Sequence, residues 1–302
     1  MILTYGAFIL LGLIWGSNFI YMKWATALIS PEQIVLLRVF FGFLPLAFAA
    51  WRKGAIDRSQ LRHLPHFLAM ASVATALYYF AIVKGTALLP SGIAGVLGGS
   101  IALFTAISSL VFLRTEKLNR LMALGVALGF AGIVMIARPW EGASNRIDPM
   151  GVFWMLSGAV ILGLSYVYVR RFLSPLNLPP LALVTWQMGL ALFILLLVTN
   201  LTGIGRITQN THAAIGLVIG LGVLGTGTAF LLYYQLLEKL GAVAASGATY
   251  ITPVVALLIG WINGEDVGIL ELAAVILILG SIAMLQLGRQ RSVQETCSSP
   301  KI

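Results

Sequence analysis

Residues 77–92 read LYYFAIVKGTALLPSG, and residues 232–247 read LYYQLLEKLGAVAASG. Each segment has a Tyr-Tyr pair, then a lysine five residues after the second tyrosine, then Ser-Gly seven residues later. The matching positions are 155 residues apart, which is about half of the 302-residue chain. A long hydrophobic chain duplicated about its midpoint is typical of secondary transporters, whose polar pathway lies between the two halves.

The composition is that of a membrane protein. Hydrophobic residues make up 59% of the chain and charged residues only 10%, whereas a soluble domain has about 25% charged residues. Each apolar stretch is long enough to cross about 30 Å of hydrocarbon as a helix. The sequence therefore predicts an all-α integral membrane protein with ten transmembrane helices, near residues 4–22, 32–51, 65–83, 88–112, 120–137, 151–169, 181–201, 213–236, 241–262 and 268–287.

The repeat divides these helices into two units of five. We expect the first repeat at residues 1–147, the second at 148–287 and a polar cytoplasmic tail at 288–302. Because five is odd, the second repeat enters the membrane inverted relative to the first. Weaker correspondences support the duplication: Pro31 with Pro180, Arg38 with Gln187, and Glu116 with Glu265.

The net charge of +9 is unevenly distributed. In the ten-helix arrangement thirteen Lys and Arg residues fall on one side of the membrane and five on the other. By the positive-inside rule, both termini of this multi-pass membrane protein are predicted to be cytoplasmic. The charge is thus a topology signal, and we expect no nucleic-acid partner. Cys297, the only cysteine, allows no disulfide framework.

Several motifs together resemble the EamA-type drug/metabolite transporter superfamily. They are the glutamate after the fourth helix of each unit (Glu116 and Glu265), Pro253 twelve residues before Glu265, and the segment Trp15-Gly-Ser-Asn18. The resemblance covers nearly the whole chain and is nearest to bacterial exporters of aromatic amino acids. It implies a basket of ten helices around a central cavity, lined mainly by helices one, three, four, six, eight and nine. One departure is that helix four has Gly98-Gly99 where helix nine has Pro253.

Tyrosines are the main candidates for contacts with a substrate. Adjacent residues on a helix point about 100° apart, so at most one of Tyr78 and Tyr79 faces the cavity squarely, and the same holds for Tyr233 and Tyr234. The alternative is an interfacial aromatic belt. Three further aromatic residues have cavity lining and ordinary packing as their two interpretations: Tyr166, Trp186 and Tyr250.

Asn18, Arg38 and Gln187 are the polar side chains furthest from any loop. Arg38 either anchors a substrate carboxylate or bonds helix-end carbonyls near the outer interface. Since helix two is not a main cavity helix in the family, we favour the structural role. Pro253 leaves a helical carbonyl without its donor, either for binding or as a kink. The candidate substrate-binding residues are Asn18, Tyr78, Tyr79, Gly99, Tyr166, Trp186, Gln187, Tyr234, Tyr250 and Pro253.

Small-residue spacings indicate close helix packing. They allow either packing within the chain or dimerisation, and we expect packing within a monomer. The pairs are Gly12/Gly16, Gly95/Gly99, Gly125/Gly129 and Gly216/Gly220.

Every acidic residue and every histidine falls in a loop or near a helix end. Proton-coupled carriers usually hold such a group inside the membrane, so the sequence predicts a uniporter, or at most a weakly coupled carrier. No metal-ligand spacing or serine-histidine pairing is visible, and we expect no cofactor and no enzyme activity. The predicted function is export of small amphiphilic metabolites, aromatic or neutral amino acids first, by alternating access. The alternatives are a multidrug or cationic-metabolite exporter and, more remotely, an intramembrane enzyme.

Overall fold

The computed structural model describes residues 2–113, 118–140, 147–236 and 248–298, and its regular elements are helices. Within these ranges nine helices are long and apolar enough to cross a membrane, and Ala248–Ile262 is a shorter apolar helix. The prediction of an all-helical membrane protein is confirmed. Four residues used to recognise the repeat lie outside the described ranges: Glu116, Lys239, Ser246 and Gly247.

The first repeat contains five helical spans, the third and fourth of which are composite. Their elements are α1 (Ile2–Thr26), α2 (Pro31–Arg52), η1 (Arg58–His63) with α3 (Leu64–Met70), η2 (Ala71–Leu77) and α4 (Tyr78–Leu88), α5 (Ser91–Gly98) with α6 (Ile101–Phe112), and α7 (Arg120–Ala137).

The second repeat follows the same order. Its elements are α8 (Pro149–Tyr168) with η3 (Val169–Leu173) and η4 (Ser174–Leu176), α9 (Pro180–Val198), η5 (Ile204–Gln209), α10 (Thr211–Ile215) with η6 (Gly216–Thr228), α12 (Ala248–Ile262) and α13 (Ile269–Ser298).

Several helix ends are fixed by local side chains. At the start of α2, where proline occupies the first helical turn, Gln33 Oε1 accepts a hydrogen bond from the Ser30 N–H at 3.2 Å. The Asp148 carboxylate accepts from the backbone N–H groups of Met150 and Gly151 at the start of α8. These caps satisfy backbone donors that have no partner inside the helix, so the spans begin at defined residues.

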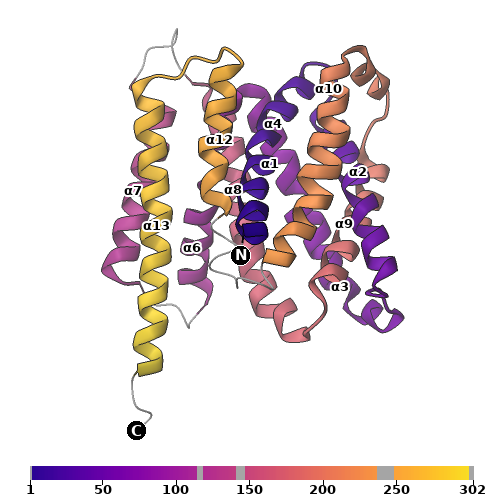
Figure 1. Ribbon diagram of the computed structural model, residues 1–302, viewed down its shortest axis with the longest axis horizontal. Helices are drawn as coiled ribbons and strands as arrows, with labels where there is room; N and C mark the ends of the chain where they lie inside the picture. The colour runs from indigo at the N-terminus through magenta and orange to yellow at the C-terminus, as the bar shows by residue number, and fades with distance from the viewer. Residues whose placement is uncertain (1, 114–117, 141–146, 237–247, 299–302) are drawn as a thin grey trace.

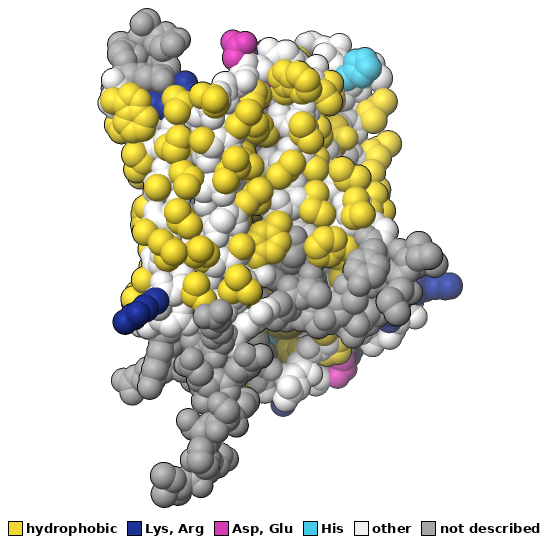
Figure 2. Space-filling view, turned by 60° about the vertical axis from the view of Figure 1, so that its left-hand side comes forward, with side chains coloured by type: hydrophobic (Ala, Val, Ile, Leu, Met, Phe, Trp, Pro, Cys, Tyr) yellow, Lys and Arg dark blue, Asp and Glu magenta, His cyan; other side chains and the backbone are white. Residues whose placement is uncertain are grey.

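The outer surface is suited to lipid. Figure 2 shows a broad band of hydrophobic side chains, with the charged side chains in view lying above and below it. Large apolar residues are exposed along this surface, including Phe48, Phe193, Leu197 and Ile276. Exposure of these side chains to water would be unfavourable, whereas contact with the hydrocarbon of a membrane is favourable.

The helix contacts are those of two repeats related by a two-fold axis. Three contacts join equivalent spans: α2 with α9, α5 with α12, and α7 with α13. Each of the other contacts has an equivalent in which the two repeats have changed places. The contact of α1 with α12 corresponds to that of α8 with α6, the contact of α2 with η6 to that of α9 with η2, and the contact of α4 with α8 to that of η6 with α1. Exchanging the two repeats therefore leaves this set of contacts unchanged, as expected for inverted repeats. In Figure 1, α1 begins in the lower half of the bundle and α13 ends at its lower edge.

Glycines bring the helices of the two repeats close together. A Cβ added at Gly16 would lie 2.5 Å from Val255 Cβ, and one at Gly95 only 2.1 Å from Ala256 Cβ. Comparable approaches occur at the other small-residue spacings, against Ile251, Leu285, Ser281 and Tyr21. For these glycines, the predicted packing within the chain is confirmed.

Two features differ from the sequence-based expectation. The fourth span, expected as one helix over residues 88–112, breaks at Gly99-Ser100 between α5 and α6, whereas α12 continues through Pro253. The tenth helix, expected near residues 268–287, continues as far as Ser298, through a segment that includes arginine, glutamine and glutamate.

We expect Gly16→Leu to destabilise the protein, because the added side chain must displace Val255 and the Thr252 carbonyl of α12. Overpacking of this kind costs about 1–3 kcal/mol. Thermal unfolding in detergent should show a lower midpoint. Gly6→Leu on the same helix is the control, since a Cβ there meets no atom within 4 Å; an equal shift for both variants would contradict the packing role.

Candidate functional site

Arg38 of α2 is buried in the middle of the bundle, with 6% of its surface exposed. Its Nε donates a hydrogen bond to Thr226 Oγ1 at 3.0 Å, and its guanidinium carbon lies 4.0 Å from the centre of the Tyr79 ring. Its third contact is with Met22 Sδ at 3.8 Å. In the described parts of the chain no carboxylate pairs with Arg38. A buried cation thus faces a ring and a hydroxyl, with guanidinium donors to spare.

Thr226 is held by the π-helical segment η6. Its hydroxyl donates to the carbonyl of Leu221, five residues earlier, at 2.9 Å. That bond directs the remaining lone pairs of Oγ1 toward Arg38. A Cβ at Gly42 would lie 2.7 Å from Thr226 Cβ, so α2 reaches η6 only because glycine occupies this position. Single π-type turns inside helices are frequent at functional sites.

Tyrosines from three spans lie near one another, and one of them, Tyr79, contacts Arg38. Tyr78 and Tyr79 have ring centroids 5.1 Å apart, and Tyr233 and Tyr234 have theirs 5.9 Å apart. Tyr166 of α8 lies within electrostatic range of all four. We call these five residues the tyrosine cluster. Half of the Tyr166 surface is accessible.

Within the first Tyr-Tyr pair the two rings have different surroundings. Tyr79 is 6% exposed and lies beneath the Arg38 guanidinium. Tyr78 is partly exposed and lies within electrostatic range of Tyr166. The pair therefore combines one ring that supports the arginine with one that has accessible surface, in keeping with their divergent directions on a helix.

Asn18 of α1 reaches the same part of η6. Its Nδ2 lies 3.5 Å from the Gly225 carbonyl oxygen, one residue before Thr226. Its Oδ1 is buried and has no hydrogen-bond partner in the described structure. A Cβ at Gly225 would lie 2.2 Å from that oxygen, so only glycine admits Asn18 here. An unsatisfied buried acceptor is costly and is a candidate contact for a bound donor.

Gln187 makes the bond in the second repeat that Arg38 makes in the first. Its Nε2 donates to Thr75 Oγ1 at 2.8 Å, and Thr75 belongs to the π-helical segment η2. Each repeat thus places a polar side chain of its second span on a threonine of a π-helical segment in the other repeat. Only the first repeat supplies a charge, so the site is asymmetric.

Trp186 does not join the tyrosine cluster. Its ring stacks on Phe67 at 5.9 Å, and its Nε1 donates to Gln60 Oε1 at 2.8 Å. It belongs to a separate apolar group with Met70 and Leu173. Its position on α9 turns it toward α3 and η3, and packing accounts for all its contacts.

The remaining candidates are Gly99, in the break between α5 and α6, and Tyr250 and Pro253 of α12. A Cβ at Gly99 would lie 3.0 Å from Pro253 Cγ, so the break in the fourth span touches the proline of the ninth. The hydroxyls of Tyr250 and Thr252 are buried without a partner among the described residues. These residues border the contact between α5 and α12 and are not shown in contact with Arg38.

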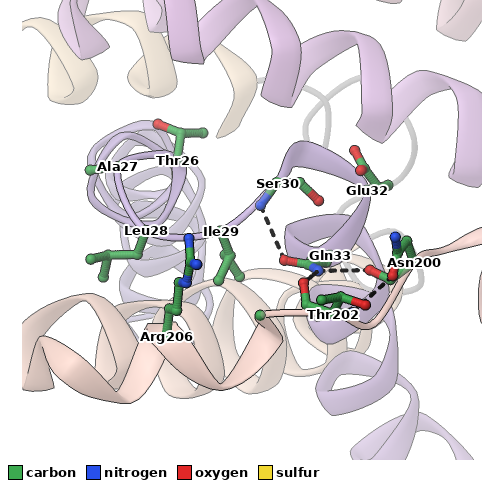
Figure 3. Close-up of a pocket in the computed structure, with 11 residues that line it drawn as sticks. Thr26, Ala27, Leu28, Ile29, Ser30, Glu32, Gln33, Asn200, Thr202 and Arg206 are labelled. Carbon is green, nitrogen blue, oxygen red and sulfur yellow. Dashed lines mark hydrogen bonds between the residues drawn. The ribbon is translucent and has the colours of Figure 1, made fainter.

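A separate polar pocket of about 420 Å³ lies at the turn between α1 and α2. Figure 3 shows Gln33 at its centre, donating to the carbonyls of Asn200 at 2.7 Å and Thr202 at 3.0 Å. Glu32 and Arg206 line opposite parts of its wall. It shares no residue with the tyrosine cluster.

The sequence pattern of the EamA-like transporter family matches this chain twice, at residues 2–138 and 149–287. The chain belongs to the EamA-like transporter family. It is a transporter and not an enzyme, and the resemblance seen in its motifs is confirmed at the level of the family.

The chain is 26% identical over 291 residues to an uncharacterized inner membrane transporter of Escherichia coli, YedA, with 94% of this chain and 91% of that protein covered. It is 24% identical over 251 residues to the uncharacterized transporter YoaV of Bacillus subtilis, covering 83% and 85%. A crystal structure with 18% sequence identity shares the fold, with a TM-score of 0.61 over 95% of this chain and 98% of that one.

Thr226→Val should lower the free energy of unfolding by about 1–3 kcal/mol, because Arg38 would lose its hydroxyl acceptor in a buried position. Thermal unfolding of the purified protein measures this. Thr105→Val is the control, since the Thr105 hydroxyl bonds only the Ile101 carbonyl of its own helix. If the two variants lost equal stability, Thr226 would have no special role in holding Arg38.

Proposed function

We propose that this chain carries small amphiphilic carboxylates, foremost aromatic and neutral amino acids, by alternating access between its two repeats. The observation that supports this is the Arg38 guanidinium, which has no carboxylate partner in the described structure and lies over Tyr79, next to the partly exposed ring of Tyr78. A guanidinium binds a carboxylate through two parallel N–H donors.

The surrounding groups fit the rest of such a molecule. Tyrosine rings offer an apolar face and a hydroxyl, which suits an aromatic or aliphatic side chain. The Asn18 Oδ1 acceptor, anchored one residue from Thr226, would receive a hydrogen bond from the substrate ammonium. A site that pairs both charged groups of a zwitterion compensates for their removal from water.

The candidate site lies between the repeats, where a transporter of this architecture changes its accessible side. We place the repeat boundary between residues 147 and 148, with a tail from residue 288. Substrate would bind on one side, the repeats would rock, and the site would open on the other side. Export is the direction expected from the family resemblance.

Cytoplasmic termini are part of this proposal, as is location in the inner membrane, where YedA is named as residing. Four described arginines lie toward the bundle end from which α1 begins: Arg52 at the end of α2, Arg58 at the start of η1, Arg120 at the start of α7, and Arg289 in the C-terminal part of α13. Basic residues collect on the cytoplasmic side of membrane proteins.

A cationic-metabolite or drug exporter is the second candidate, and Arg38 weighs against it. A cation close to this guanidinium would meet like-charge repulsion. Within the described ranges the site also contains no carboxylate to serve as a counter-charge. Transport of amines, which carry a positive charge and no carboxylate, therefore distinguishes the two candidate functions.

In proteoliposomes, Arg38→Gln should reduce uptake of an aromatic amino acid by about ten-fold or more, because a charged hydrogen bond to the carboxylate contributes about 1.5–3 kcal/mol. Uptake of the corresponding amine, which has no carboxylate, should not fall. Radiolabelled uptake of the two compounds measures both effects. Lys84→Gln is the control, since Lys84 is a basic residue that lies against the Phe80 ring of its own helix. Equal loss for acid and amine would refute the carboxylate anchor.

Transport should not be driven by protons. In the described residues no acid or histidine faces the tyrosine cluster: Glu265 and Glu271 lie at one membrane edge, and His66 bonds Tyr168 near the other. A pH gradient alone, with equal substrate on both sides of the liposome membrane, should cause no net uptake. Accumulation under these conditions would refute uniport.

A further inference from the structure

Glu265, in the link between α12 and α13, caps a helix of the other repeat. Its Oε1 accepts from the Ser91 N–H at 2.6 Å and its Oε2 from the Gly92 N–H at 2.8 Å, at the start of α5. Both oxygens thus satisfy amides that have no partner inside α5. A negative charge at this position also interacts favourably with the helix dipole.

Lys23, near the end of α1, binds the end of α4, the helix that precedes α5 in the chain. Its Nζ donates to the carbonyls of Ala87 at 3.0 Å and Leu89 at 2.8 Å, at the end of α4, with Thr86 at 3.4 Å. Its charge is close enough to Glu265 for the two to interact. The two helix ends that meet at residues 89–90 therefore bind opposite charges. The positive Lys23 binds the C-terminal end of α4 and the negative Glu265 binds the N-terminal end of α5, and each charge has the sign that the helix dipole favours at that end.

The binding of Glu265 depends on close packing of α5 against α12. A Cβ at Gly260 would lie 2.4 Å from Glu265 Oε2 and 3.0 Å from the Gly92 nitrogen. Leu257 of α12 lies against Gly92, and Phe19 of α1 lies against Gly95 and Gly98. Three helices are thus sealed together at this end of the bundle.

The same α5 is a half-length span with a break at its inner end. It ends at Gly98, and α6 begins at Ile101. Gly99, within the break, touches Pro253, where α12 has lost a helical hydrogen bond. The break at the end of α5 and Pro253 of α12 therefore lie at the same depth. Ends of helices are where hinge rotations are usually taken up.

We propose that Lys23 and Glu265, together with the helix ends they hold, form an ion clasp that keeps this end of the transport pathway closed. Opening requires the Glu265 carboxylate to leave the Ser91 and Gly92 amides while α5 swings about Gly99-Ser100. The clasp rests on the alternating-access mechanism proposed above and is independent of the substrate, so that it adds gating residues to the transport cycle.

The test is thiol labelling in nanodiscs with a water-soluble maleimide. The background is Cys297→Ser, which removes the only native cysteine. Leu257→Cys reports from beneath the clasp, where the native side chain is 6% exposed. Phe19→Cys is a second reporter should the first not fold. Leu173→Cys, in the separate apolar group of Trp186, reports general loosening.

Glu265→Gln should raise the labelling rate at Leu257→Cys or Phe19→Cys by about ten-fold or more, because two charge-assisted hydrogen bonds are lost. The rate at Leu173→Cys should not change. Glu271→Gln is the matched control: Glu271 also accepts a backbone N–H, from Gly268 at 2.9 Å, but does not touch α5. Lys23→Met should open the same end, and the double variant should label no faster than the more reactive single variant.

The clasp is refuted if Glu265→Gln leaves both gate reporters unreactive, if Glu271→Gln raises them equally, or if Leu173→Cys becomes reactive in parallel. These readings require no substrate, so failure of the amino-acid panel leaves the clasp standing. Conversely, a transporter that moves amino acids as proposed but does not open here would place its gate elsewhere.

Discussion

A chain embedded in lipid has no water with which to satisfy its polar groups, and the protein meets this constraint by close contact between its two repeats. Glycines let α1 and α5 approach α12, and let α2 approach η6. Polar side chains cross these contacts and find their partners in the opposite repeat: Arg38 on Thr226, Gln187 on Thr75, and Glu265 on the start of α5. The interface that holds the two repeats together therefore also contains these polar contacts.

Much of the fold could be predicted because the bilayer imposes it. Its thickness sets the length of each apolar stretch, and the Tyr-Tyr to Ser-Gly match revealed the duplication. The break at Gly99-Ser100 and the π-helical segments η2 and η6 could not be predicted in the same way. They depend on hydrogen bonds of single side chains, such as that of Thr226 with the Leu221 carbonyl inside η6, and on contacts with other helices. Neither leaves a periodic pattern in the sequence.

The site was predictable only in part, for a related reason. Tyr78, Tyr166 and Tyr234 do come together, but Trp186 packs elsewhere and Arg38 lies at the site instead of bonding helix-end carbonyls. A helix that is apolar on all sides has no polar stripe to show which of its faces points inward and which points toward lipid. The family resemblance assigned helix two a minor role in the cavity, yet the long arginine side chain reaches across from it to Tyr79.

The unequal partners in the duplicated bond, arginine in one repeat and glutamine in the other, distinguish this protein from a symmetric carrier. In a carrier with identical halves, the inward-facing and outward-facing forms would have equal energy, and substrate would bind equally well from either compartment. A single fixed charge removes that equivalence. In the alternating-access mechanism proposed above, this charge would bias the resting population toward one orientation, and the half-saturation concentrations on the two sides would differ. The equilibrium distribution of the solute, which only an energy source can shift, stays the same.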